Sequence, residues 1–332
     1  MIVDSHSHIL VGRDMDALAE IGGPAMGKIT EFVRGIIKEK PQTTDLNLRL
    51  AQLDKFGIDY QLATLMPSLN PNNVSLEPEN ALKISKLIND GMASITRETG
   101  GRIVCTGNIS MEALNSGGLD EMERAFKDLG LRGFGMPTHV RGKPVDAPEF
   151  RPFWAKASEM GAPVYLHPVD PINKKDRSYE ADFDLIHVFG WPFETTLAMC
   201  RLVFSGIMEE YDNLEIVTHH LGGMVPYYWA RIEECYIPQF EPKTGVRLKR
   251  PLKELFSKFY FDTVIGDNPG ALRCAYEIFG GDHFLLGTDA PFGPGNGDVI
   301  LESYPRVIRE LGLSEKETAG ILGENARRLL KI

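Results

Sequence analysis

Two histidines near the N-terminus, His6 and His8, have the spacing of a metal site on a β-strand. The apolar pair Ile2-Val3 before them favours a strand over residues 1–8. Residues i and i+2 of a strand point to the same face, so the two imidazoles, which are common zinc ligands, can converge on one cation. Asp4 shares that face and is placed to orient a ligand. The alternative, an exposed and frayed terminus, is disfavoured by the β-prone pair, and further ligands must come from elsewhere.

Three other places in the chain put histidine or aspartate directly after an apolar run. One of these runs ends in two adjacent histidines, His219 and His220. Strand alternation lets only one of the two face inward, and the sequence does not decide which. The alternative for each residue is structural: a core histidine bonded to the backbone, or a carboxylate that caps the next element. Three imidazoles and one carboxylate suit zinc, with manganese or cobalt as alternative ions. The residues are His167, Asp289 and the adjacent pair His219 and His220.

The elements that must position these residues follow a regular alternation of strand and helix. Eight apolar segments are predicted as strands, and each is followed by a helical pattern. This count predicts an α/β fold of the (β/α)₈ TIM-barrel type, whose active sites lie at the carboxyl ends of the strands. The histidines and the aspartate fall at those ends. The predicted strands are residues 1–8, 58–66, 102–109, 131–138, 163–167, 214–220, 258–264 and 283–289.

Two long stretches, residues 10–44 and 170–191, are predicted as insertions after strands 1 and 5. The first is expected to contain helical pieces such as Ile29–Lys38. No internal repeat or low-complexity linker divides the chain, so residues 1–332 are predicted to form a single barrel domain. An open doubly wound sheet would favour Gly-x-Gly-x-x-Gly after the first strand, which the sequence lacks. The main predicted helices are residues 45–56, 78–99, 119–129, 150–160, 194–211, 224–235, 269–279 and 325–330, with a capping box at Ser314 and Glu317.

Composition excludes several classes of protein. The formal net charge of −10 argues against a nucleic-acid partner, although local arginines can still bind a small anionic substrate. No apolar run reaches the roughly 18 residues of a transmembrane helix, and the N-terminus lacks a signal-peptide pattern. The four cysteines are widely spaced, which is typical of free thiols in a reducing compartment. The sequence therefore predicts a cytoplasmic protein without a nucleic-acid or membrane partner.

Four short motifs carry a family resemblance: Asp4–His8 (DSHSH), His167-Pro168, His220–Gly223 (HLGG) and Gly287–Phe292 (GTDAPF). In these motifs the chain resembles the metal-dependent decarboxylase branch of the amidohydrolase superfamily. The resemblance extends over nearly the whole chain. It implies a TIM barrel and an enzyme that uses a metal ion to remove a carboxyl group from its substrate.

The resemblance also implies roles for individual residues. His220 is implied as the acid/base group beside the ion, and its neighbour His219 as a residue that packs outward. The implied metal ligands are His6, His8, His167 and Asp289.

Two arginines, Arg49 and Arg231, fall where this family binds a substrate carboxylate. In the family the second arginine comes from a neighbouring subunit, so the resemblance implies a homodimer. For each arginine the alternative is a solvated helix face. Trp191 and Phe292 are candidates to wall a flat conjugated substrate, and core packing is the alternative for both.

These features predict a metal-dependent, non-oxidative decarboxylase of a small unsaturated or aromatic carboxylic acid. A metal-bound water or a metal-chelated substrate is expected, with proton transfer by His220 or Asp289. One alternative is a metal-dependent hydrolase, a lactonase or amidohydrolase, that uses the same metal-activated water. Another is a binding module with a closed structural metal, which the position of the ligands at strand ends disfavours.

Overall fold

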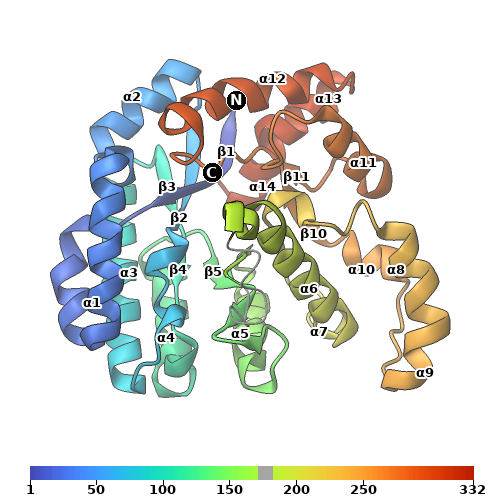
Figure 1. Cartoon of the computed structure of the whole chain (residues 1–332), viewed down its shortest axis with the longest axis horizontal. Helices are drawn as coiled ribbons and strands as arrows, with labels where there is room; N and C mark the ends of the chain where they lie inside the picture. The colour runs from blue at the N-terminus through green and yellow to red at the C-terminus, as the bar shows by residue number, and fades with distance from the viewer. Residues whose placement is uncertain (171–181) are drawn as a thin grey trace.

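The computed structural model describes residues 1–170 and 182–332, and its parallel strands form two sheets flanked by helices (Figure 1). The smaller sheet pairs β1 (Val3–Ile9) with β2 (Tyr60–Leu65), and β2 with β3 (Ile103–Cys105). The larger sheet has the order β11-β10-β9-β8-β5-β4. Its strands are β4 (Gly107–Asn108), β5 (Phe134–Pro137), β8 (Val164–His167), β9 (Ile216–Thr218), β10 (Phe259–Asp262) and β11 (Phe284–Leu285), and a short antiparallel pair, β6 (His139–Val140) and β7 (Lys143–Pro144), follows β5.

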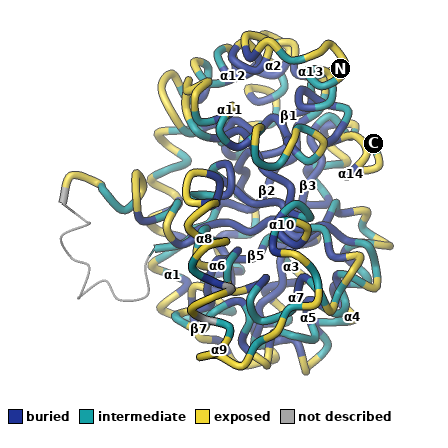
Figure 2. Tube along the Cα trace, turned by 90° about the vertical axis from the view of Figure 1, so that its right-hand side faces the viewer, coloured by how far each residue is buried: buried dark blue, intermediate teal, exposed yellow. Residues whose placement is uncertain are grey.

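The two sheets enclose a common interior, which Figure 2 shows as a continuous buried region. Backbone hydrogen bonds link the sheets at both edges: Thr106 N donates to Ala63 O over 3.2 Å, and His8 N donates to Ala290 O over 2.8 Å. The C-terminal helix α14 (Asn325–Leu330) packs against the amino ends of the strands. The side chains that meet inside are Val3, Leu62, Val104, Tyr165, Val217, Tyr260 and Leu285, together with Leu329 and Leu330 of α14.

The predicted α/β class with parallel strands is confirmed, and the closed ring of eight strands is confirmed only in part. Regular pairing is interrupted at Thr106, between β3 and β4, and β11 contributes only two paired residues. Paired strands are also shorter than the predicted apolar runs; the segment 214–220 pairs only over Ile216–Thr218. Residues on both sides of such strands are buried, so an apolar run does not mark where pairing ends.

Most helices begin and end near their predicted limits. Asp45 caps α2 (Leu46–Phe56) by accepting a hydrogen bond from Leu48 N, and Gly57, with φ of 65°, ends it. The predicted helix 194–211 is divided into α6 (Trp191–Phe204) and α7 (Ile207–Glu210), and the helix predicted over 224–235 begins only with α8 (Trp229–Cys235). The capping box of Ser314 and Glu317 is confirmed. The other helices are α3 (Pro78–Glu98), α4 (Gly118–Glu123), α5 (Arg151–Met160), α9 (Glu241–Thr244), α10 (Leu252–Phe256), α11 (Pro269–Phe279), α12 (Asp298–Glu310) and α13 (Glu315–Ala319).

The first predicted insertion is mostly one helix, α1 (Met15–Glu39), which is longer than the predicted Ile29–Lys38 and is kinked at Gly23-Pro24. It lies beside α3 at one side of the molecule (Figure 1). Half of the second insertion, residues 171–181, lies outside the described residues. Within the described ranges, no helix is both long and apolar enough to cross a membrane.

Candidate metal centre

Three histidines from β1 and β8 meet at the carboxyl ends of these strands. The potential ligand atoms of His6, His8 and His167 all lie within 4.8 Å of one another, and the Nε2 atoms of His6 and His8 are 3.4 Å apart. Asp289 Oδ1 lies 3.0 Å from His8 Nε2 and 3.7 Å from His6 Nε2. Two ligands of a tetrahedral zinc ion, each about 2.1 Å from it, are about 3.4 Å apart. These atoms therefore already have the spacing that a divalent ion requires.

Each of the three imidazoles is held by its other nitrogen. His6 Nδ1 lies 2.6 Å from Asp262 Oδ2, His8 Nδ1 lies 3.0 Å from Thr64 Oγ1, and His167 Nδ1 lies 2.6 Å from the carbonyl oxygen of Pro168. A carbonyl or carboxylate oxygen can only accept, and the Thr64 hydroxyl already donates to a backbone carbonyl. All three rings are therefore oriented as Nδ1–H donors, which leaves the Nε2 lone pairs for an ion.

Burial keeps four of the five clustered histidines uncharged at pH 7. It lowers the pKa of His8, of His167 and of His220, and it lowers the pKa of His219 to about 3. These rings are neutral at pH 7 and keep a lone pair. Burial raises the pKa of Asp289, but the close contact between its Oδ1 and His8 Nε2 outweighs burial and lowers this pKa to about 2. Neutral imidazoles and an ionised carboxylate are the forms in which these groups bind a cation.

Asp262, at the end of β10, is a residue that sequence reasoning missed. Its Oδ2 accepts from His6 Nδ1 and, over 2.7 Å, from His219 Nδ1, while its Oδ1 accepts from Val264 N over 3.1 Å. Burial lowers the pKa of His6, but the Asp262 carboxylate outweighs this and the net shift is upward; the same pairing holds the pKa of Asp262 well below its usual value. The available signal was an apolar run, Phe259–Phe261, followed by an aspartate, as at the other sites.

Asp4 orients the segment that carries Asp289 rather than an imidazole. Its Oδ1 accepts from Thr288 N over 3.0 Å, and its Oδ2 accepts from Thr288 Oγ1 over 2.7 Å and from Gln61 Nε2 over 2.6 Å. Asp289 follows directly, with φ of 65°. This left-handed backbone, fixed by Asp4, turns the Asp289 carboxylate toward the histidines.

The expectation that His219 packs outward is wrong. Val217 points into the interior, and the backbone is still extended at His219, so strand alternation turns His219 inward as well. Its ring is fully buried and stacks on His6, with 3.6 Å between ring centroids. His220 lies beyond β9 with φ of 54°, so alternation does not apply to it; its ring centroid is 6.2 Å from that of His6 and 6.1 Å from that of His167. Both histidines of the pair therefore reach the site.

The structure places Arg49 beside the cluster and Arg231 at the surface. Arg49, fully buried on α2, donates from Nε to Gln61 Oε1 over 2.6 Å and from Nη2 to Ala290 O over 2.8 Å, and its buried Nη1 has no partner among the described residues. Burial lowers the pKa of Arg49 to about 10, so the guanidinium stays charged at pH 7. Arg231 is exposed on α8.

The two predicted aromatic residues flank the histidines. The ring centroid of Trp191 is 5.7 Å from that of His167 and 6.1 Å from that of His220. The ring centroid of Phe292 is 5.7 Å from that of His8. A planar ligand bound at the histidines would therefore lie near two aromatic rings.

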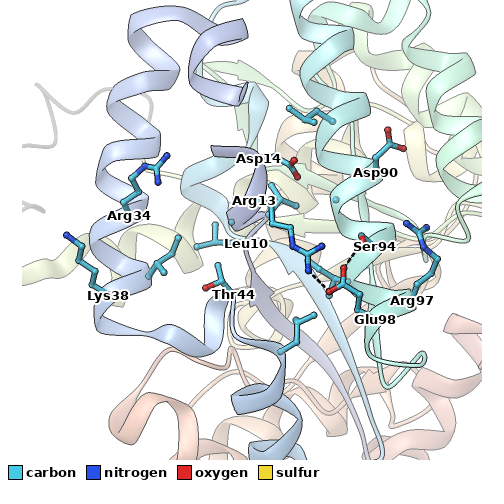
Figure 3. Close-up of a pocket in the computed structure, with 17 residues that line it drawn as sticks. Leu10, Arg13, Asp14, Arg34, Lys38, Thr44, Asp90, Ser94, Arg97 and Glu98 are labelled. Atoms are coloured by element: carbon cyan, nitrogen blue, oxygen red, sulfur yellow. Dashed lines mark hydrogen bonds and ion pairs between the residues drawn. The ribbon is translucent and has the colours of Figure 1, made fainter. Parts of the chain in front are cut away.

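Two cavities differ in their relation to this cluster. A small one, of about 20 Å³, lies in the interior and is lined by His167 and His219. A larger one, of about 700 Å³, lies between α1 and α3, where Arg13 and Glu98 pair across it over 2.5 Å (Figure 3). None of the clustered histidines lines the larger cavity, so it is separate from the candidate metal centre.

Comparison with known proteins gives one family and several relatives. A family model described as "Amidohydrolase" matches residues 3–332. A 2-amino-3-carboxymuconate-6-semialdehyde decarboxylase from Dictyostelium discoideum is 29% identical over 86% of this chain and 76% of its own length. A γ-resorcylate decarboxylase from Rhizobium sp. (strain MTP-10005) is 28% identical over 86% of each chain.

Among solved structures, a 5-carboxyvanillate decarboxylase from Novosphingobium aromaticivorans, in complex with manganese and 4-hydroxy-3-methoxy-5-nitrobenzoic acid, has a TM-score of 0.85. It is 20% identical, and the match covers 100% of this chain and 96% of that one. At this identity the likeness shows a shared fold.

Proposed function

Because the chain belongs to the amidohydrolase family, we propose that it is a metal-dependent, non-oxidative decarboxylase of a small aromatic or unsaturated carboxylic acid. The observation that carries the proposal is the convergence of three Nδ1-anchored imidazoles and the Asp289 carboxylate. The curated relatives are named for decarboxylation, of a muconate semialdehyde and of γ-resorcylate, which supports this reaction. The hydrolase alternative is therefore not favoured.

The proposed barrel is a closed (β/α)₈ ring that spans residues 1–332 as a single domain. The family match over residues 3–332 and the common interior of the two sheets support it. The proposal includes a cytoplasmic location, which suits the cysteines of the described residues, all of them free.

A divalent ion would be held by His6, His8, His167 and Asp289. Zinc suits this donor set of three nitrogens and one oxygen, and the manganese in the complex of the structural relative keeps manganese as an alternative beside cobalt. Such an ion supplies a Lewis acid that stabilises negative charge on substrate oxygen atoms. The residues of the chain fit the ion, because their lone pairs are free and already closely spaced.

The substrate would be oriented by arginine and aromatic side chains. The unpartnered Nη1 of Arg49 can donate to a carboxylate, and Trp191 and Phe292 can stack on a planar ring. Arg231 is exposed on α8, next to the exposed Tyr227 and Tyr228, so we propose that it serves the site of a second copy in a homodimer.

Decarboxylation exchanges a carboxylate for a proton on carbon. The carbon–carboxyl bond breaks, carbon dioxide leaves, the bonding electron pair stays on the carbon, and that carbon gains the proton. His220 and Asp289 are the two groups beside the cluster that can deliver it. The low pKa of Asp289 suits a ligand, whereas His220, with no partner on Nδ1 among the described residues, is available to exchange a proton.

Turnover tests the proposed reaction directly. Protein reconstituted with zinc, manganese or cobalt is expected to release carbon dioxide or bicarbonate from at least one acid in a panel of carboxylated phenols and muconate semialdehydes. The organic product should lack that carboxyl group, as measured by mass spectrometry. Release of a ring-opened or hydrolysed acid without carbon dioxide would instead identify a hydrolase.

The homodimer can be tested by mixing two inactive variants. Arg49→Ala and Arg231→Ala, each expected to lose most activity, should regain about a quarter of wild-type activity when refolded together, because half of the dimers then contain one site with both arginines. Two Arg49→Ala variants with different tags serve as the matched control and should stay inactive. No recovery in dimers shown to be mixed would contradict a shared site.

A further inference from the structure

The small interior cavity beside the metal centre is lined by both polar and apolar side chains. Its volume of about 20 Å³ accommodates a single water molecule or hydroxyl group. His219, after β9, and Asn108, at the end of β4, both line it, together with the apolar Val169. His219 is fully buried and Asn108 is 2% exposed, so neither side chain is satisfied by bulk water.

Three polar side-chain atoms of the lining residues have no hydrogen-bond partner among the described residues: the Tyr165 hydroxyl, His219 Nε2 and Asn108 Nδ2. Buried polar atoms in folded proteins are nearly always paired, with protein, water or ligand. The His219 side chain is held by the bond from its Nδ1 to Asp262, and the Asn108 backbone is held by the bond from its N to Asn89 Oδ1 over 2.8 Å. These unpaired atoms therefore indicate a group that occupies the cavity in the working enzyme.

The Tyr165 hydroxyl can both donate and accept, so His219 Nε2 and Asn108 Nδ2 define that group. The Asp262 carboxylate only accepts, so His219 carries its proton on Nδ1 and its Nε2 is an acceptor. Asn108 Nδ2 is a donor. A hydroxyl satisfies both, because it donates one hydrogen bond and accepts another. A carboxylate or a methoxy group cannot, because neither has a hydrogen to donate.

We propose that His219 and Asn108 form a subsite for a ring hydroxyl of the substrate, directed into the barrel interior beside His167. The inference rests on the proposed function and narrows its substrate class to hydroxylated aromatic acids. The subsite is distinct from the contacts between the arginines and the substrate carboxylate. Its role is to select among ring-substituted acids, and it takes no part in breaking the carbon–carboxyl bond. A site built to bond a hydroxyl strongly rejects the analogue that lacks it.

Binding of inert analogues tests the subsite without turnover. In nitrophenols a nitro group replaces the carboxylate, so no carbon dioxide can leave. Calorimetry on the zinc-loaded protein would compare 2-nitrophenol with the four isomers that carry one further hydroxyl. At least one isomer is expected to bind about tenfold more tightly or better, and its methoxy counterpart is expected to lose that gain.

Two variants locate the effect. Asn108→Leu removes the donor at similar volume, and His219→Asn keeps an N–H for Asp262 but removes the Nε2 position. Each is expected to reduce the hydroxyl gain to about threefold or less. Val169→Ala is the matched control in the same cavity. It should change the affinity for all the nitrophenols by a similar factor, so that the further hydroxyl still strengthens binding. Thermal melting and bound zinc verify each variant, and if one does not fold the other decides.

The proposal is overturned if no isomer gains tenfold, or if the gain survives in a folded variant. This outcome is separate from the fate of the proposed function, because the nitrophenols are bound and not converted. If no acid in the turnover panel is decarboxylated but the further hydroxyl still strengthens binding through Asn108, the proposed reaction is wrong and the subsite stands. If an acid is decarboxylated but the further hydroxyl does not strengthen binding, the reaction stands and the subsite is wrong.

Discussion

Replacing His167 by alanine is expected to abolish tight binding of the divalent ion and to lower kcat/KM by about 10³-fold or more. A bound ion contributes several kcal/mol to transition-state stabilisation, and each 1.4 kcal/mol is about a tenfold change in rate. His167 comes from β8, whereas His6 and His8 come from β1, so its loss leaves two imidazoles on one strand. Inductively coupled plasma mass spectrometry of the dialysed protein, together with the rate of carbon dioxide release, measures both effects.

The matched control is His283→Ala. His283 is also partly buried, but its ring stacks on Tyr260, with 4.2 Å between centroids, and its Nδ1 contacts Phe259 O over 3.3 Å, away from the ligand cluster. This variant is expected to keep one ion per chain. A His167→Ala protein that still binds one ion with wild-type affinity would contradict the proposed ligand set.

The meeting of the histidines could be anticipated because strand ends are legible in the sequence. His6 and His8 follow an apolar pair at the spacing of one strand face, and His167 ends an apolar run before a proline. Parallel strands that alternate with helices bring such ends to one side of the fold, whatever their distance along the chain. Position along each strand was therefore enough to make these histidines candidates, whereas the ligand set was implied by the family resemblance.

The direction of His219 could not be predicted in the same way. Ile216 and Val217 are both apolar and both buried, one against the surrounding helices and the other in the interior, so the sequence shows no alternation there. Only the packed structure shows that Val217, and hence His219, points inward. The same two-sided burial made the predicted strands too long.

Asp262 escaped prediction because its role depends on histidines from two other strands, β1 and β9. An aspartate after an apolar run is equally consistent with a cap, and Asp262, unlike Asp289, lies in none of the four family motifs. The distinction appears only when His6 and His219 stack and present their Nδ1 atoms to one carboxylate oxygen. The proposed ligands of the ion were therefore easier to anticipate than the residue that orients His6.

Replacing Asp262 by asparagine, which keeps the size and removes one acceptor, is expected to weaken ion binding by about 10- to 100-fold. Oδ2 of Asp262 accepts from two imidazoles and Oδ1 accepts from Val264 N, so both oxygens face donors. Either orientation of the amide therefore places its NH₂ group against an N–H. One buried donor is left unpaired, which costs about 1–3 kcal/mol of the free energy of unfolding. Competition with a chromogenic chelator and chemical denaturation measure the two effects.

The two orientations of the amide are expected to reduce ion affinity and stability to different extents. If NH₂ faces the histidines, His6 must move its proton to Nε2 and can no longer offer that atom to the ion, so affinity falls most. If NH₂ faces Val264, His6 keeps its tautomer and stability falls most. The exposed Asp282, changed to asparagine, should do neither. An Asp262→Asn protein with wild-type affinity and stability would show that this carboxylate does not orient the cluster.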